Sequence, residues 1–299
     1  MPKRLLLPFV PGSILLVIGV ATAIAGPAAR TQAYYALQRE WFQHWPLDHG
    51  VALPRLVQPT FRPFTPVWVQ VEPNIKMLLD PDDYVSRQIL ETGQWERDSW
   101  RVVQQHLQNG ATFIDVGAHI GYYSLKAAPV VGPSGRVLAI EPNPDTVRKL
   151  RDNIQASGAR SVTVEPVACA DTEGTLELFA APEANTGETS LSRANASQSG
   201  AAVNSYQVRA RPLDDIIRDA GVSRVDAVKI DVEGAELLVL KGARETMARF
   251  HPMILVEIVD SQLRAMGTSA DEVTAFLHSQ GYTEQGRFGD NFQFLAANR

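Results

Sequence analysis

The chain has 299 residues, enough for one large domain with an appendage, and its composition is that of an ordinary globular protein. A formal net charge of −5, with no Lys/Arg block beyond the first few residues, argues against the basic surface that nucleic-acid binding normally needs. The single Cys169 excludes an intrachain disulfide framework and a thiolate metal cluster, and six scattered histidines predict no metal site.

The N-terminal segment Leu5–Ala25 is a run of 21 residues without a charge, preceded by Lys3 and Arg4. As a helix it would be roughly 31 Å long, about the thickness of the hydrocarbon core of a bilayer. Pro8 and Pro11 would weaken or kink its first half. The sequence therefore predicts an N-terminal hydrophobic helix that is interrupted near its start.

Three interpretations of residues 1–30 remain open. We favour a retained single-pass membrane anchor. A cleaved signal peptide is the second, because Ala23-Ile-Ala before Gly26 resembles a signal-peptidase site, and a buried or mis-started segment is the third. The aromatic residues that follow suit an interfacial belt, or they simply pack on the domain: Tyr34, Tyr35, Trp41, Phe42 and Trp45.

Residues 31–75 are predicted to form an aromatic and proline-rich juxtamembrane linker, because the prolines within 46–75 break regular structure. Short elements follow over 76–110, with a helix around 98–108. From residue 112 strands and helices alternate, which predicts βαβ units and a parallel sheet in a domain over 76–299. The expected strands are 112–116, 136–141, 162–167, 226–230, 253–259 and 292–296, and the expected helices are 121–130, 144–156, 234–248 and 269–280.

An insertion over 172–212 interrupts this alternation. Two strands, 175–179 and 206–210, flank a stretch rich in Ser, Ala, Asn and Gly at 184–204. The pattern predicts a hairpin-like insertion with a mobile tip, placed to cover a bound acceptor as lids do.

The segment 111–124 predicts one half of a nucleotide-cofactor site. A strand delivers Asp115, and a loop of small residues then leads to the N-terminus of a helix, where backbone N–H groups are free. The next strand ends in Glu141, an acid placed to take both hydroxyls of a ribose. The small residues of the loop are Gly117, Ala118 and Gly121.

The acid before this loop indicates which cofactor it binds. A dinucleotide site prefers Gly-x-Gly-x-x-Gly, and the Asp115 carboxylate would repel a pyrophosphate. The same carboxylate suits the cationic amino-acid tail of S-adenosylmethionine. An ordinary strand-to-helix turn, with small residues for packing only, is the alternative.

A second acidic segment follows the strand 226–230. Asp231 and Glu233 come directly after the strand, and Gly234 opens a helix that carries Glu236. Ligands of open α/β sheets bind beyond the carboxyl ends of the strands, so we expect Asp231 and Asp115 to face one crevice. Alternatively, Asp231 or Glu233 only stabilises the start of the helix.

The chain resembles the FkbM-type methyltransferases, a class I S-adenosylmethionine-dependent family, over about 76–297. The resemblance implies a Rossmann-like α/β fold with helices on both faces of a seven-stranded, mostly parallel sheet whose last strand is antiparallel. It also implies O-methylation, commonly of sugar or polyketide hydroxyls. The motifs that carry it are Phe113-Ile-Asp-Val-Gly-Ala-His-Ile-Gly-Tyr-Tyr-Ser, Glu141-Pro-Asn, Val167-Ala-Cys-Ala-Asp, Pro212-Leu-Asp-Asp and Lys229-Ile-Asp-Val-Glu-Gly-Ala-Glu.

The resemblance assigns roles on the cofactor side of the site. Glu141 would bind the ribose diol, Pro142 and Asn143 would border the adenine, and Asp171 would lie near the adenine amino group. The loop around the cofactor would be Asp115, Gly117, Ala118 and Gly121.

On the reacting side, the resemblance places Asp231 at the methyl group, with Glu233 close by. Methyl transfer to a neutral hydroxyl needs a base that removes the hydroxyl proton. Asp231 is our first candidate, Glu233 the second and His119 the third. His119 stands where the family usually has Asn, and a histidine titrates near neutrality.

We expect a small-molecule or glycan acceptor and a cytoplasmic catalytic domain, because the cofactor is made in the cytosol. A nucleic-acid methyltransferase is disfavoured, since an Asn/Asp-Pro-Pro-Tyr segment and a basic face are missing. The loop disfavours a nicotinamide dehydrogenase. The alternative function is an inactive membrane-tethered protein that binds the cofactor or a glycan.

Overall fold

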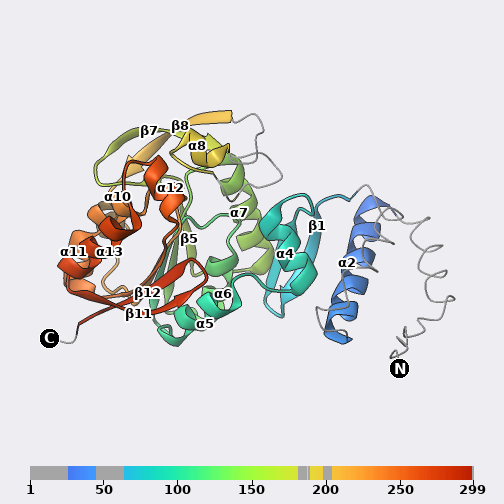
Figure 1. Cartoon of the computed structure of the whole chain (residues 1–299). Coiled ribbons are helices and arrows are strands. Elements are labelled where there is room, and N and C mark those ends of the chain that lie inside the picture. The colour runs from blue at the N-terminus through green and yellow to red at the C-terminus, as the bar shows by residue number, and fades with distance from the viewer. Residues whose placement is uncertain (1–25, 45–63, 181–186, 188, 198–203, 298–299) are drawn as a thin grey trace, which may run out of the picture.

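The computed structural model describes residues 26–44, 64–180, 187, 189–197 and 204–297 (Figure 1). Its centre is a seven-stranded sheet with the order β11-β12-β10-β9-β3-β4-β5. Strand β12 is antiparallel to both neighbours, and the other pairings in the sheet are parallel, as the family resemblance implied. The strands are β3 (Thr112–Val116), β4 (Arg136–Ile140), β5 (Val162–Glu165), β9 (Ala227–Ile230), β10 (Met253–Glu257), β11 (Tyr282–Phe288) and β12 (Asn291–Ala296).

The central strands are apolar on both faces, so each face needs its own cover. Phe113 and Ala227 belong to one hydrophobic core, and their chain neighbours Ile114 and Val228 belong to a second core on the opposite face. The first core is covered by α5 (Arg97–Gln105) and α6 (Tyr122–Val131). The second is covered by α9 (Leu213–Asp219), α10 (Glu236–Lys241), α11 (Arg244–Phe250), α12 (Asp260–Ala265) and α13 (Ala270–Ser279).

Two predicted helices are confirmed, and each of their ends lies within one residue of the expected position. Asn143 caps α7 (Pro144–Ser157) by accepting the Asp145 N–H, and the helix ends at left-handed Gly158. Ser269 caps α13 by accepting the Glu272 N–H.

The helix predicted over 234–248 is wrong, because the chain breaks there into α10 and α11. A side chain on Gly242 would lie 2.1 Å from the carbonyl oxygen of Ala170, so the backbone passes this loop too closely for any other residue. The N-terminus of α11 is capped by a residue from a distant part of the chain. The Asp214 carboxylate accepts hydrogen bonds from the N–H groups of Glu245 and Thr246 at 2.9 and 2.8 Å.

Strand β11 was not predicted. Its sequence after Gly281 is mostly polar, and a bulge between Glu284 and Gly286 shifts its register with β12. A polar, bulged strand at the edge of a sheet has little of the apolar pattern by which strands are recognised. The neighbouring strand predicted at 292–296 is confirmed as β12.

The lead-in folds against the main domain. It consists of α2 (Pro27–His44), the hairpin β1 (Val67–Glu72) and β2 (Ile75–Leu79), α4 (Tyr84–Thr92) and the loop that follows α4 as far as Glu96 (Figure 1). Within the predicted linker, residues 67–72 form a strand, in which Val67 is buried and Val69 and Val71 pack on the core. Tyr34 and Tyr35 are 4 and 2% exposed, so they pack on the domain.

Within the described residues, the chain has no helix that combines the length and the apolarity needed to cross a bilayer. The predicted anchor at 5–25 lies outside those residues, as do most of the proline-rich stretch and the side chains of Trp41, Phe42 and Trp45. The anchor and the boundaries of the linker stay predictions.

The insertion forms the predicted hairpin. Strand β7 (Gly174–Ala180) pairs antiparallel with β8 (Asn204–Arg211), and β6 (Ala168–Cys169) joins β8 on the other side. The short helix α8 (Arg193–Ala196) lies between β7 and β8 in the chain. The structure describes residues 187, 189–197 and 204 of the predicted tip at 184–204, and its mobility stays a prediction.

Gly117 follows β3 and lies against Asp231, the residue after β9, so we expect this position to tolerate no side chain. It has φ 81°, and a Cβ would lie 1.7 Å from the carbonyl oxygen of Asp231. We expect Gly117→Ala to destabilise the fold by more than about 2 kcal/mol in denaturant unfolding.

Gly158 provides the matched control, because it has φ 62° with no described atom within 4 Å of a built Cβ. Gly158→Ala should cost only the left-handed backbone, about 1–2 kcal/mol. Equal losses in the two variants would show that the contact with Asp231 has no effect on stability.

Candidate cofactor and acceptor site

The carboxyl ends of four neighbouring strands open into one cavity of about 1060 Å³, counting its mouth. Each strand places an acid there, either at its end or directly after it: Asp115, Glu141, Asp231 and Glu257. Ligands of open α/β sheets bind at this edge, beyond the carboxyl ends of the strands.

Most residues predicted for the site line this cavity: Asp115, Gly117, Ala118, His119, Glu141, Pro142, Asp231 and Glu233. Three lie outside the lining. Gly121 precedes α6, and Asn143 caps α7 while its N–H supports Glu141. Asp171 is exposed and does not line the cavity. Its neighbours in the chain, Ala168 and Cys169, line the cavity instead.

Glu141 is held by two backbone amides. The N–H of His119 donates to Oε2 at 3.0 Å, and the N–H of Asn143 donates to Oε1 at 2.9 Å. Each oxygen keeps a lone pair for a hydroxyl, so the carboxylate is oriented to accept from a vicinal diol. Burial raises the pKa of Glu141 to about 7.

Asp115 is buried beneath the loop that follows β3. Ser124 Oγ donates to its Oδ2 at 2.6 Å, while Oδ1 has no hydrogen-bond partner among the described residues. Burial raises the pKa of this carboxyl. A buried acid with one unused oxygen fits a ligand that carries a positive charge.

Two candidate catalytic residues have left-handed backbones, His119 with φ 50° and Glu233 with φ 54°. Such angles are uncommon outside glycine and cluster at functional sites. Burial lowers the pKa of His119, so its imidazole is neutral near pH 7 and free of the charge that would repel a cationic ligand.

Asp231 is paired with a buried lysine. Lys229 Nζ lies 2.8 Å from Asp231 Oδ2, and the side chains are 4 and 23% exposed. Burial by itself would raise the pKa of Asp231, but the Lys229 ammonium and the hydrogen bonds from Lys229 and Glu257 together outweigh burial and leave that pKa below its ordinary value. Asp231 is therefore ionised at neutrality, as a base must be.

The insertion and α12 hold Glu233. Ser190 Oγ and Asn195 Nδ2 donate to its backbone carbonyl at 2.6 and 2.8 Å, and Gln262 Nε2 donates to its carboxylate. Glu236 has a different role, because its Oε1 accepts the N–H groups of Val232 and Gly234. The N–H groups before α10 are thus satisfied by Glu236, not by Asp231 or Glu233 as the capping alternative proposed, and Asp231 and Glu233 line the cavity.

Sequence reasoning missed two acids of the site. Glu257 ends the apolar strand β10 and carries the same signal as Asp115 and Glu141, an acid at the end of a buried strand. Glu96 gave no such signal, because it lies in the lead-in. Tyr123 Oη and Asn291 Nδ2 donate to Glu96 at 2.8 and 3.0 Å.

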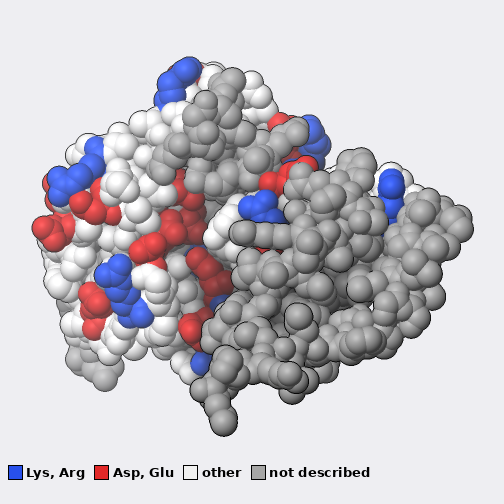
Figure 2. Space-filling model, turned by 45° about the vertical axis from the view of Figure 1, so that its right-hand side comes forward, with Lys and Arg blue, Asp and Glu red and all other residues white. Residues whose placement is uncertain are grey.

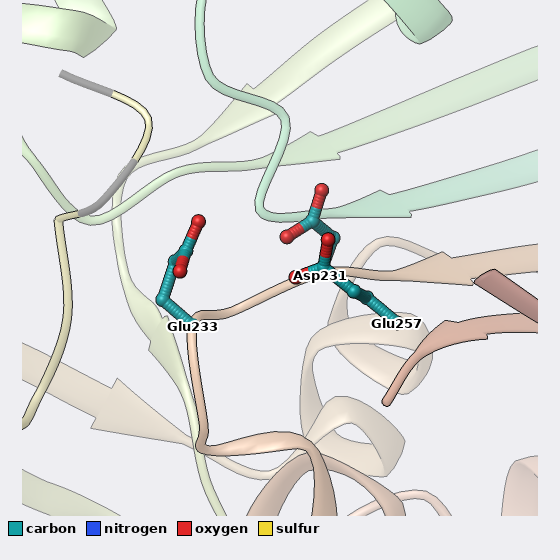
Figure 3. A group of neighbouring side chains, drawn as sticks. All are labelled: Asp231, Glu233 and Glu257. Carbon is teal, nitrogen blue, oxygen red and sulfur yellow. The ribbon is translucent and has the colours of Figure 1, made fainter. Parts of the chain in front are cut away.

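Figure 3 shows Glu257 reaching alongside Asp231, with Glu233 across from them. One oxygen from each of the three lies within 4.8 Å of the others, close enough to contact a single cation. The ammonium of Lys229 already supplies positive charge at this group. On the face seen in Figure 2, acidic side chains gather near the centre, and Lys and Arg occur in separate small groups.

The sequence pattern of the FkbM methyltransferase domain matches residues 115–284, which is more than half of the chain. The chain therefore belongs to the FkbM methyltransferase family. A crystal structure of the FkbM methyltransferase from Methylobacillus flagellatus is 17% identical, with a TM-score of 0.42 over 71% of this chain and 62% of that one.

Three curated relatives are similar over part of their length. The AMB antimetabolite synthetase AmbE of Pseudomonas aeruginosa is 28% identical over 68% of this chain and 11% of its own. The hexuronic acid methyltransferase AglP of Haloferax volcanii is 28% identical over 54 and 62%. The methyltransferase sdnD of Sordaria araneosa is 29% identical over 47 and 63%. The chain spans less than two thirds of each relative.

Cofactor affinity should depend on pH through Glu141. Its pKa of about 7 means that acid conditions protonate the carboxyl, which then accepts hydroxyl hydrogen bonds less well. We expect S-adenosylhomocysteine, the demethylated cofactor, to bind roughly tenfold more weakly at about pH 6 than at about pH 8. Isothermal titration calorimetry measures this difference.

Glu141→Gln is the control, since it removes the titrating group with little change of volume. The variant should bind weakly at both pH values and lose most of the pH dependence. Wild-type affinity that is the same at both would refute the role of Glu141.

Proposed function

We propose that the protein is an S-adenosylmethionine-dependent O-methyltransferase that acts on a hydroxyl of a sugar, glycolipid or secondary metabolite. The observation that carries this proposal is one cavity that joins a diol-accepting acid, Glu141, to an ionised acid, Asp231. Family membership supports methyl transfer. A relative named as a hexuronic acid methyltransferase supports a sugar acceptor.

The residues at the cofactor end fit this donor. Asp115 has an unused buried oxygen for the cationic amino-acid tail, and Glu141 accepts from the ribose. Gly117 and Ala118 hold the loop close to β4, because both N–H groups donate to the carbonyl of Ile140 at 3.0 Å. When bound, S-adenosylmethionine supplies an electrophilic methyl group.

The acceptor end is formed by the lead-in and the insertion. Trp95 and Glu96 line it from the lead-in, and Ser190 lines it from the insertion, where its Oγ donates to the Glu233 carbonyl. An acceptor hydroxyl in this space would lie beside Asp231, which takes the hydroxyl proton as the oxygen attacks. The cavity adds to the rate by holding the reacting atoms in line.

Replacing the base should affect turnover and leave cofactor binding nearly unchanged. We expect Asp231→Asn to lower the rate of labelled-methyl transfer into a membrane or glycolipid extract by roughly 10²–10⁴-fold. Affinity for S-adenosylhomocysteine should stay within about threefold, since Asp231 contacts the reacting end only. Circular dichroism checks that the variant folds.

Glu233→Gln separates the two candidate bases. Turnover that falls with Glu233→Gln and survives in Asp231→Asn would transfer the role of base to Glu233. A wild-type protein that binds the cofactor but labels nothing would favour the non-catalytic binding protein.

We further propose that residues 1–30 anchor the chain in a membrane, with the catalytic domain on the cytoplasmic side. Support comes from the uncharged run at 5–25, whose length matches a bilayer. The full-length protein should sediment with membranes and need detergent for release. Leu15→Arg combined with Leu16→Arg should move it to the soluble fraction, because charged residues are costly at the centre of a bilayer.

A wild-type chain found in the soluble fraction would contradict the anchor. A chain that mass spectrometry shows to be shortened at its N-terminus would identify a cleaved signal peptide.

A further inference from the structure

Two of the acids at the cavity are in direct contact. Glu257 ends β10 and Asp231 follows β9, and the two strands run parallel with Val256 opposite Ile230. The side chains therefore leave the sheet at adjacent positions, an oxygen of one carboxyl group lies within 4.8 Å of an oxygen of the other, and Glu257 hydrogen bonds to Asp231. Two ionised carboxylates have only acceptors to offer each other, so this contact needs a proton.

The described surroundings of Glu257 do not provide a hydrogen-bond donor that would stabilise an ionised carboxylate there. Its Oε2 atom is buried and has no hydrogen-bond partner among the described residues. Lys229 bonds to Asp231, and Asn291, which faces Glu257 across the strand pair, donates to Glu96. A buried acceptor left without a donor is costly, and a proton on Glu257 removes that cost.

We propose that Glu257 keeps a proton at neutral pH and donates it in a hydrogen bond to Asp231. The pair then carries one negative charge, held between the Glu257 hydroxyl and the Lys229 ammonium. Glu257 is a positioning residue for the base: with two donors fixing the carboxylate of Asp231, its remaining lone pairs are aimed into the cavity. The catalytic consequence rests on the proposed function, whereas the proton itself is a property of the folded protein.

The charges around Glu257 agree with this assignment. Burial first, and then the negative charges of Asp231 and Glu233, raise the pKa of Glu257 well above its ordinary value, while Lys229 opposes them. The other elements that face the cluster add Asp115 from β3, Glu96 from the lead-in, Tyr123 from α6, neutral His119 from the loop after β3, and Glu236 from α10. Most of them are acidic, so they hold the proton in place.

Infrared difference spectroscopy tests the proton without an acceptor. At neutral pH, the wild-type spectrum minus that of Glu257→Gln should show the C=O absorption of one protonated carboxylic acid. The matched control is Glu177→Gln, an exposed glutamate on β7, whose difference spectrum should show carboxylate absorption instead. Glutamine keeps a donor to Asp231, so Glu257→Gln should fold and bind S-adenosylhomocysteine normally.

A second comparison covers the case in which Glu257→Gln does not fold. In Asp231→Asn the neighbouring negative charge is gone, so the acid absorption of Glu257 should disappear at a lower pH than in the wild type. If the acid absorption of Glu257 disappeared at the same pH in both proteins, that result would contradict the contact between Glu257 and Asp231.

Two outcomes would overturn the proposal. One is a difference spectrum for Glu257→Gln that shows only carboxylate bands at neutral pH. The other is calorimetric binding of Mg²⁺ by the wild type that Glu257→Gln abolishes, because a metal ion requires the ionised ligand. The first result would mean that Glu257 is ionised, and the second that a cation takes the place of the proton.

For the positioning role, methyl transfer into the extract should be kept in Glu257→Gln and fall at least tenfold in Glu257→Ala. The wild type should also lose activity at alkaline pH, where Glu257 gives up its proton, and Glu257→Gln should not. Equal losses in both variants would assign Glu257 a structural role only. If neither the wild type nor any variant transferred labelled methyl groups, that result would count against the proposed function. The infrared result on the proton of Glu257 would still stand.

Discussion

The site depends on one buried lysine. Lys229 lies opposite Asp115 in the pairing of β3 with β9 and bonds to Asp231, so a single ammonium serves acids from two segments of the chain. Without it, the carboxyl edge of the sheet would bury several negative charges, and each would need a proton. Lys229 is what allows Asp231 to stay ionised and usable as a base.

The same lysine ties the lead-in to the sheet. Its Nζ lies 4.9 Å from the centroid of the Tyr123 ring, and Tyr123 donates to Glu96, which also accepts from Asn291 of β12. These contacts join α6, the lead-in and the last strand around one side of the cavity. The lead-in therefore lines the cavity on this side, and under the proposed function changes in it should alter which acceptor fits.

Much of the fold and about half of the site chemistry could be predicted from local pattern. Acids that follow buried strands, such as Asp115 and Glu141, could be recognised from the sequence, whereas the family resemblance assigned Asn143 to the adenine and did not predict that it caps α7. Features set by distant contacts could not be predicted. The break at Gly242 depends on Ala170, the pairing of Glu257 with Asp231 depends on strand order, and β11 has too polar a sequence.

The most direct test of the central claim is a crystal structure of the protein soaked with S-adenosylhomocysteine. The account predicts electron density in the cavity, with the ribose hydroxyls on Glu141, the amino group near Asp115 and the sulfur facing Asp231. An empty cavity at saturating ligand, or a ligand bound elsewhere on the protein, would contradict it.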